Sequence, residues 1–324
     1  MADKTVTVMP SGGTYATLAA AIAGELSANA NLVSMAGILH IKIDGTWSSA
    51  DSTSVNLTGF TVNSSYYVDI YTTVTSRHLG VWSSSYYQLA GTYDWNTKFI
   101  INNAYSRVTG LQIQNTSTSG GSGVEIDAGP CQFIASIIRG CQQYGVIGKD
   151  GNNIMANCVV SGNLSGGLQI GQNGTQTWSV YNCAFVNNGG YGIYVDEYRT
   201  ILAKNCYAGG NATAGYGHST NGTLTPTTCY SDDGSLSTTV AAWSTSSGGK
   251  FTNVTSGSEN IHIKSGSTLI AAGTDLHADG TYPFAVDIDG QARPNGSWDV
   301  GPDQYIAAGG GGVGGAMLAR FRRT

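Results

Sequence analysis

Short alternations of apolar and polar residues recur along this chain at a nearly constant interval. Gly145-Val-Ile, Gly167-Leu-Gln-Ile, Gly192-Ile-Tyr-Val and Gly215-Tyr-Gly each open a short strand after a turn, at steps of 22, 25 and 23 residues. A strand points alternate side chains to opposite faces, and parallel strands stack about 4.8 Å apart. We attribute the glycines to corners whose backbone conformation opposes a β-carbon. The pattern predicts an all-β solenoid, a right-handed single-stranded parallel β-helix with coils of about 23 residues.

A column of cysteines keeps the same register. Two interpretations are open, because neighbouring Cα atoms about 4.8 Å apart lie within the disulfide range, whereas parallel Cβ directions oppose the bond. We expect free thiols that point inward as small hydrophobes. An Asn at a turn is expected to bond the Asn above and below it. The ladder positions are Asn157, Cys158, Asn182, Cys183, Asn205, Cys206 and Cys229, whereas Cys131 and Cys141 lie off the ladder and receive no role.

The repeat divides the chain into three parts. Residues 38–305 are predicted to form the parallel β-helix, with the most regular coils at 108–263 and the repeat extending forward to Asn253-Val254 and Ile261–Ile263. Residues 1–37 hold a strand and a helix whose apolar positions recur every four residues, as in an amphipathic helix that caps the first coil. Residues 306–324 form a glycine-rich linker and a basic tail.

Charge and composition exclude several classes of protein. Charged residues make up 11% of the chain and the net charge is −5, which gives no general affinity for nucleic acid or an anionic membrane. The five histidines show no metal-ligand spacing and no Cys-x-x-Cys occurs, so we expect neither a metal nor a cofactor. The first residues lack the pattern of a secretory signal, and we expect synthesis in a host cytoplasm.

Three parts of the chain resemble a known family: the opening Thr-Val-Met-Pro-Ser-Gly-Gly-Thr-Tyr-Ala-Thr-Leu, the Asn-Cys coils, and the closing Asp289-Gly-Gln-Ala-Arg293 and Asp299-Val-Gly. They resemble the pectate-lyase-like right-handed β-helix proteins, and more narrowly the β-helix proteins of bacteriophage virions. The resemblance covers nearly the whole chain. It is specific for the fold and weak for activity, because this fold carries lyases, hydrolases, phage tailspikes and non-enzymatic surface proteins.

A lyase-type site of this family needs carboxylates that share a calcium ion and a basic residue. Asp127, Lys149 and Asp196 occupy one column at the strand ends, but the two aspartates lie three coils apart, about 14 Å, which is too far for one ion. Asp127 and Lys149 are neighbours, and we expect them to form a surface ion pair.

A hydrolase-type site needs two carboxylic acids that flank the scissile bond. Asp232-Asp233 and the segment Gly215–His218 resemble its pieces faintly, but in reversed order, and aspartates also favour turns. The cluster Asp196, Glu197, Tyr198 and Arg199 suits a contact surface or a sugar contact. We therefore assign no catalytic residue, and keep Asp196, Glu197, Arg199, Asp232 and Asp233 as alternatives.

The C-terminal tail is the feature with the character of a partner-binding element. After the glycines, its apolar side chains could be buried and its basic ones could pair with an acidic surface. The other interpretation is a disordered end that happens to be basic. The partner-binding candidates are Met317, Leu318, Arg320, Phe321, Arg322 and Arg323.

Two functions from different classes follow. The first is a non-enzymatic structural protein on the exterior of a phage virion, such as a head decoration or fibre, which contacts other capsid or tail proteins. The alternative is a tailspike-type lyase or hydrolase that binds or degrades a cell-surface glycan, held by aromatic residues of 60–95 or by the loop 196–199.

Overall fold

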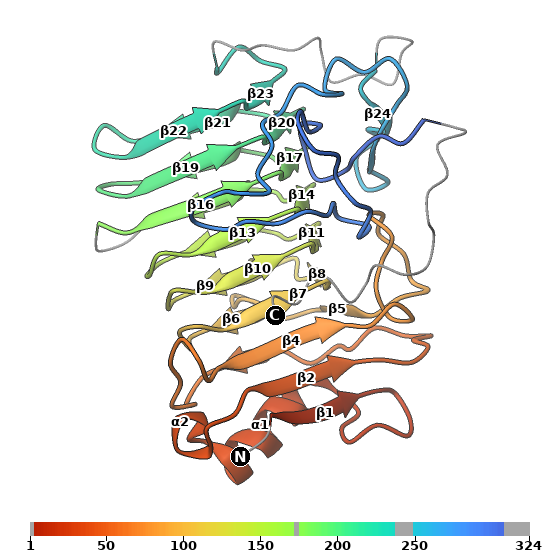
Figure 1. Cartoon of the computed structure of the whole chain (residues 1–324), viewed down its shortest axis with the longest axis vertical. Helices are drawn as coiled ribbons and strands as arrows, with labels where there is room; N and C mark the ends of the chain where they lie inside the picture. The colour runs from red at the N-terminus through yellow and green to blue at the C-terminus, as the bar shows by residue number, and fades with distance from the viewer. Residues whose placement is uncertain (1–2, 172–174, 237–248, 308–324) are drawn as a thin grey trace.

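The computed structural model describes residues 3–171, 175–236 and 249–307, and shows a parallel β-solenoid (Figure 1). Its strands form three long parallel sheets that run along the axis, so each coil contributes one strand to each sheet. Among the described residues, no helix is long and apolar enough to cross a membrane.

The three sheets contain nine, seven and seven strands. The first sheet holds β1 (Lys4–Val8), β2 (Leu39–Ile43), β4 (Val68–Thr72), β7 (Arg107–Thr109), β10 (Gln132–Ile134), β13 (Ile154–Ala156), β16 (Thr177–Tyr181), β19 (Thr200–Lys204) and β22 (Thr223–Thr227). The second holds β5 (Gln88–Gly91), β8 (Gln112–Asn115), β11 (Ile137–Arg139), β14 (Val159–Ser161), β17 (Ala184–Val186), β20 (Tyr207–Gly209) and β23 (Tyr230–Ser231). The third holds β3 (Val55–Leu57), β6 (Phe99–Ile101), β9 (Val124–Ile126), β12 (Tyr144–Gly148), β15 (Gly166–Ile170), β18 (Tyr191–Val195) and β21 (Ala214–His218).

Two short helices cover the N-terminal end of the solenoid. Helix α1 (Leu18–Asn29) begins after Thr17, whose hydroxyl accepts a hydrogen bond from Ala20 N, and α2 (Leu32–Met35) follows it. Helix α1 buries Leu18 and Ile22 against the first coil, as the four-residue spacing predicts. Strand β1 already pairs with β2 in parallel, so the segment 1–37 contributes the first strand of the solenoid as well as its cap.

The cysteine column lies inside the solenoid. Cys158, Cys183, Cys206 and Cys229 are all buried and free, as are Cys131 and Cys141. The backbone N–H of Cys158 lies 3.4 Å from Sγ of Cys183, and the N–H of Cys206 lies 3.4 Å from Sγ of Cys229. The thiols therefore fill the interior, and the disulfide interpretation is wrong.

Two columns of asparagines behave differently. Asn163, Asn188 and Asn211 form a ladder, in which Nδ2 of Asn163 donates to Oδ1 of Asn188 at 3.0 Å and Nδ2 of Asn188 donates to Oδ1 of Asn211 at 2.9 Å. The asparagines before the cysteines, for which the ladder was predicted, turn outward instead and bond the strap backbone at Asn157 and Asn205. Asn157 and Asn205 have φ of 52° and 54°, a left-handed conformation that Asn tolerates better than most residues, at the corner between the first and second sheets.

The glycines that open the strands of the third sheet are required for a reason other than the predicted backbone conformation. Gly145, Gly167 and Gly192 do not adopt a left-handed φ. A Cβ at Gly145 would lie 2.4 Å from Cγ1 of Val160, and one at Gly167 would lie 2.4 Å from the carbonyl oxygen of Gly192. Glycine is therefore required because atoms of the neighbouring coil leave no room for a Cβ, and not because of the backbone conformation.

The predicted extension of the repeat to Asn253-Val254 and Ile261–Ile263 is wrong. The last strand in the three sheets is β23, and β24 (Phe251–Asn253) and β25 (Asn260–Ile263) instead form an antiparallel pair. The segment 249–305, here called the strap, lies against the outside of the solenoid wall (Figure 1, blue). Its apolar residues pack on outward side chains of the wall, so the alternation that resembled a further coil serves a second core.

The second core joins the strap to the corner between the first two sheets. The rings of Tyr207 and Phe251 lie 4.9 Å apart, and the strap residue Trp298 is fully buried. The outward asparagines bond the strap backbone: Asn157 Nδ2 donates to Val286 O at 2.8 Å, and Asn205 Nδ2 donates to the Thr274 carbonyl, also at 2.8 Å. Backbone groups of an irregular segment are satisfied in this way.

Candidate functional site

The outer face of the first sheet is open where the strap does not cover it. His40, Asp69, Arg107 and Gln132 stand in one row across β2, β4, β7 and β10, because the strand register pairs each with the next. Each is flanked along its strand by buried apolar residues, so the alternation of the strand directs the polar side chain outward. The row lies in a hollow of about 200 Å³.

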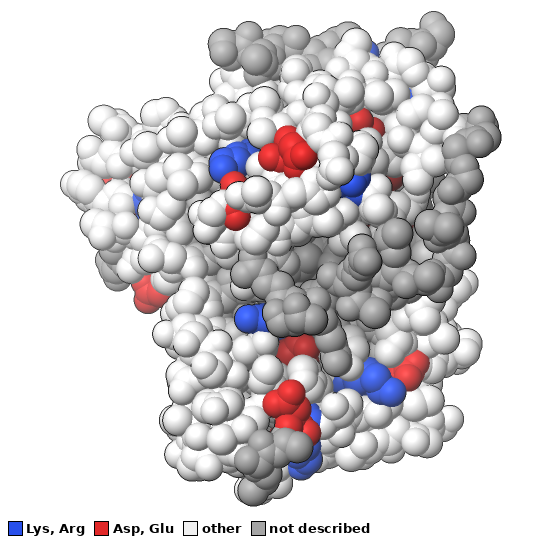
Figure 2. Space-filling model, in the orientation of Figure 1, with Lys and Arg blue, Asp and Glu red and all other residues white. Residues whose placement is uncertain are grey.

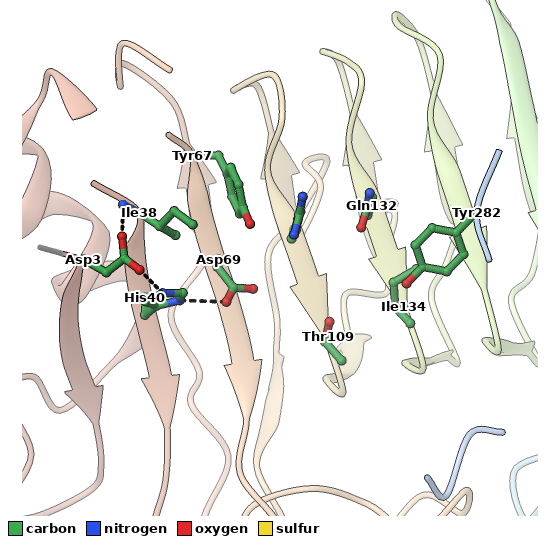
Figure 3. A pocket seen from close by; sticks show the side chains of 10 residues that line it. Asp3, Ile38, His40, Tyr67, Asp69, Thr109, Gln132, Ile134 and Tyr282 are labelled. Atoms are coloured by element: carbon green, nitrogen blue, oxygen red, sulfur yellow. Dashed lines mark hydrogen bonds and ion pairs between the residues drawn. The ribbon is translucent and has the colours of Figure 1, made fainter. Parts of the chain in front are cut away.

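Figure 3 shows how these side chains meet. His40 Nδ1 lies 2.8 Å from Oδ2 of Asp69, and its Nε2 lies 3.7 Å from Oδ2 of Asp3. The guanidinium of Arg107 stacks over the ring of Tyr67 at 4.1 Å. The lining residues are Asp3, Ile38, His40, Tyr67, Asp69, Arg107, Thr109, Gln132, Ile134 and Tyr282.

This hollow, here called the sheet groove, combines charge with hydrogen-bonding groups. Asp69 is hydrogen-bonded to Nδ1 at the edge of the His40 ring, and stacking on Tyr67 holds the planar guanidinium of Arg107 by its face. A guanidinium held by its face still presents its N–H edge, which can bind a carboxylate through two parallel hydrogen bonds. Gln132 and Thr109 add groups that both donate and accept hydrogen bonds. The arrangement suits an acidic, hydroxyl-rich ligand.

The structure exposes only part of the charged loop 196–199, where Glu197 and Tyr198 reach solvent. Arg199 is fully buried, and its Nη2 atom lies 3.6 Å from Oδ1 of Asp150. Asp196 accepts a hydrogen bond from the backbone N–H of Glu197, while Tyr198 is 62% exposed. The basic member of the cluster is therefore buried inside the turn and does not face solvent.

Asp232 and Asp233 both serve turns. Asp232 accepts from Gly210 N at 2.9 Å, and Asp233 accepts from Gly215 N and from both the backbone and the hydroxyl of Ser235. Although burial opposes it, these donors hold the pKa of Asp233 below its usual value. Neither carboxylate lines the sheet groove.

Asp127 and Lys149 form the expected ion pair at 3.5 Å, with an unexpected third member. Glu125 Oε1 lies closer to Lys149 Nζ, at 2.7 Å. Burial and the neighbouring Glu125 raise the pKa of Asp127 to about 6. The trio is half-buried at the third sheet, and one Lys neutralises only one of its two carboxylates.

The predicted partner-binding residues Met317–Arg323 lie outside the described residues, so the structure does not place them. Figure 2 shows the face that carries the sheet groove: charged residues form small groups on a surface that is mostly uncharged. This pattern agrees with the 11% of charged residues in the chain.

Sequence reasoning missed the sheet groove. The alternation Leu39-His-Ile-Lys-Ile43 does place His40 on an outward position. However, Asp69 and Arg107 are 38 residues apart, more than one regular repeat, so counting could not show that they are neighbours.

Among curated proteins, no match to this chain was found. A crystal structure of the pectate lyase Pel9A is similar over 94% of this chain and 97% of that one, with 13% identity and a TM-score of 0.50. A pectin methylesterase from Aspergillus niger, in deglycosylated form, covers 74% of this chain and 89% of its own, with 12% identity and a TM-score of 0.47.

At 13% identity, the likeness to the pectate lyase shows the fold alone. The family model for the right-handed β-helix region matches residues 99–280, more than half of the chain. The predicted parallel β-helix is thereby confirmed, and the chain belongs to the right-handed β-helix family.

Proposed function

We propose that this protein is an exterior component of a bacteriophage virion that binds an acidic glycan in the sheet groove. The sheet groove carries the proposal for binding: Arg107 stacks on Tyr67 and stands in one row with His40, Asp69 and Gln132. The virion role is supported by the resemblance of the opening and closing segments to phage β-helix proteins. A solenoid also suits a rigid exterior element, because each coil is fixed by its neighbours.

Acidic saccharides fit the groove better than neutral ones. The carboxylate of a uronic acid would meet the N–H edge of Arg107, and ring hydroxyls would meet Gln132 and Thr109. The hollow of about 200 Å³ is smaller than the roughly 300–1,000 Å³ of pockets for drug-sized ligands, and its size suits one sugar residue of a chain.

Replacing Arg107 by Ala is expected to weaken binding of uronic-acid oligosaccharides about 10- to 100-fold, because a charge-assisted contact is lost. Isothermal titration with oligogalacturonate and its methyl-esterified form measures the effect. Arg139→Ala is the matched control, since Arg139 also stacks on an aromatic ring (Trp82, 4.4 Å) but does not line the groove. Equal affinities of wild type and Arg107→Ala would contradict the proposed site.

Cleavage is the second candidate, and the His40–Asp69 pair at 2.8 Å favours it. A histidine oriented by a carboxylate is a common general base. With the same saccharides, with and without calcium, we expect no release of unsaturated or reducing ends. Release that His40→Gln abolishes would establish an enzyme in place of a binding protein. Dependence on Asp196 or Asp232 would place the chemistry at those aspartates instead.

Attachment to the particle is proposed to use the tail, on the evidence of its sequence. Deleting residues 309–324 should leave the melting temperature nearly unchanged, while the protein disappears from purified particles. A chain that keeps the glycines but carries Ser in place of Arg320, Arg322 and Arg323 separates the linker from the tip. Normal incorporation of the deleted chain would show that attachment lies elsewhere, and the first aromatic coils would then be the candidate.

A further inference from the structure

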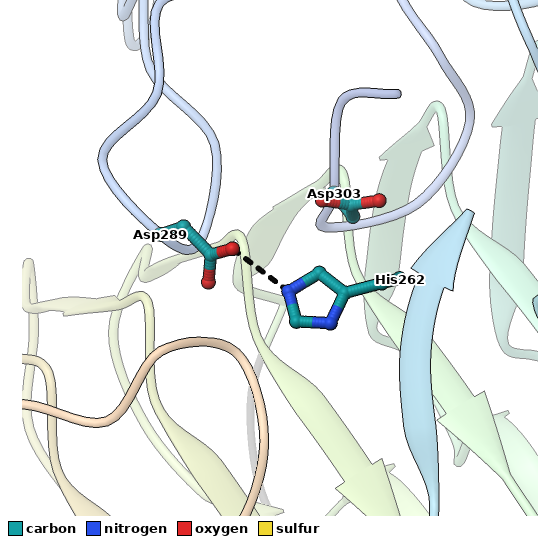
Figure 4. Close-up of side chains that lie close together, drawn as sticks. All are labelled: His262, Asp289 and Asp303. Atoms are coloured by element: carbon teal, nitrogen blue, oxygen red, sulfur yellow. Dashed lines mark hydrogen bonds and ion pairs between the residues drawn. The ribbon is translucent and has the colours of Figure 1, made fainter. Parts of the chain in front are cut away.

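Three ligand-type side chains from distant parts of the strap meet at one point. His262 lies on β25, and Asp289 and Asp303 follow it by 27 and 41 residues. One ligand atom of each lies within 4.8 Å of the others (Figure 4). His262 Nε2 is 2.7 Å from Oδ2 of Asp289, and Asp303 Oδ2 accepts from the backbone N–H of Ile263 at 2.6 Å.

The cluster contains an unsatisfied oxygen. Oδ1 of Asp289 is buried and has no hydrogen-bond partner among the described residues. Gly80, in the loop between β4 and β5, packs closely against this atom: a Cβ there would lie 2.5 Å from Oδ1 of Asp289 and 2.8 Å from Nε2 of His262, so no larger residue fits at this position. A buried carboxylate oxygen without a partner requires explanation by a water or an ion.

The charges under the strap are also unbalanced. The surrounding carboxylates belong to Asp287, Asp289, Asp299 and Asp303, whereas the guanidiniums belong to Arg77 and Arg293. Four negative charges against two positive ones leave an excess of two among these mutually interacting residues. A divalent cation supplies that amount, and a protonated histidine supplies half of it.

We propose that His262, Asp289 and Asp303 bind a divalent transition-metal ion, with Zn²⁺ as the best-fitting ion, which joins three separate segments of the strap to one another. One imidazole and two carboxylates suit zinc better than calcium, which prefers oxygen ligands alone. Ligand atoms about 2.1 Å from a metal lie roughly 3.0–3.4 Å apart, so shifts of about 1–2 Å complete the site. The ion takes the place of the proton on Nε2 of His262.

The test uses the full chain after treatment with a chelator. Isothermal titration with Zn²⁺ should show one saturable site, and Zn²⁺ should raise the melting temperature. Asp289→Asn is expected to weaken binding at least 10-fold. Asp275→Asn is the matched control: Asp275 pairs with His277 on the same strap, with 2.6 Å between its Oδ1 atom and Nδ1 of His277, and belongs to no third-ligand cluster among the described residues. This control should keep wild-type affinity.

Two outcomes would overturn the site: no saturable binding of Zn²⁺, or equal affinities in wild type and Asp289→Asn. Should circular dichroism show that Asp289→Asn is unfolded, Asp303→Asn replaces it, because its amide oxygen can still accept from Ile263 N. Zn²⁺ bound at the buried thiols would persist in both variants and would likewise refute the assignment.

Discussion

Replacing Cys183 by Asp is expected to lower the free energy of unfolding by about 3–5 kcal/mol, one of the two largest effects in this protein. Cys183 is fully buried between Cys158 and Cys206, and burial raises the pKa of its thiol, which therefore stays neutral. A carboxylate in its place meets an interior without a cation to pair with it, so it must either lose its charge or admit water. Urea denaturation followed by circular dichroism measures the loss.

The control for this prediction is Cys183→Ala, which removes the sulfur but adds no charge. It should cost no more than about 1–2 kcal/mol, since only a small cavity forms. A loss below about 1 kcal/mol for Cys183→Asp would mean that the position reaches solvent, contrary to the inward ladder. The contrast between the variants separates the effect of charge from that of packing.

Replacing Arg293 by Ala is expected to cost a similar amount, about 3–5 kcal/mol, and to release the strap. The buried guanidinium donates to the carbonyl oxygens of Gly301 and Pro302, both at 3.0 Å, and to that of Asp299 at 3.3 Å. It also lies 3.5 Å from Oδ1 of Asn157 on the solenoid wall. Its loss leaves several buried acceptors without donors. It also removes a positive charge from a group of residues in which carboxylates already outnumber guanidiniums.

Limited proteolysis tests the release of the strap directly. In Arg293→Ala, cleavage within residues 249–305 should accelerate, and fluorescence of the buried Trp298 should report exposure to water. Arg107→Ala is the control, because Arg107 lies on the open face and should change neither signal. A proteolysis pattern like that of wild type would show that the second core alone holds the strap.

The strap connects the stability of the fold with the candidate site. Its apolar residues pack on β13, β14, β16, β17 and β20 of the wall, whereas the sheet groove lies over β2, β4, β7 and β10. Tyr282 of the strap lines the edge of the sheet groove, where it lies next to Ile134 of β10. Release of the strap should therefore widen the sheet groove as well as expose the apolar wall.

The sequence by itself determined the solenoid. Its coils stack in parallel, so one position in each coil meets the same position in the next, and a column such as Cys158, Cys183 and Cys206 is visible as a spacing. The inward thiols and the pair of Asp127 and Lys149 followed from that register. The capping helix followed from its own spacing of apolar residues.

Only the tertiary structure decided the strap, the sheet groove and the metal cluster. Alternation at residues 251–263 shows that one side of a strand is apolar, but it does not show whether that side faces the interior or the outer wall. His40, Asp69 and Arg107 meet across coils of unequal length, and His262 meets Asp289 and Asp303 through an irregular chain. Such contacts depend on chain paths that no constant spacing encodes, so they become visible only when the strap is folded onto the solenoid.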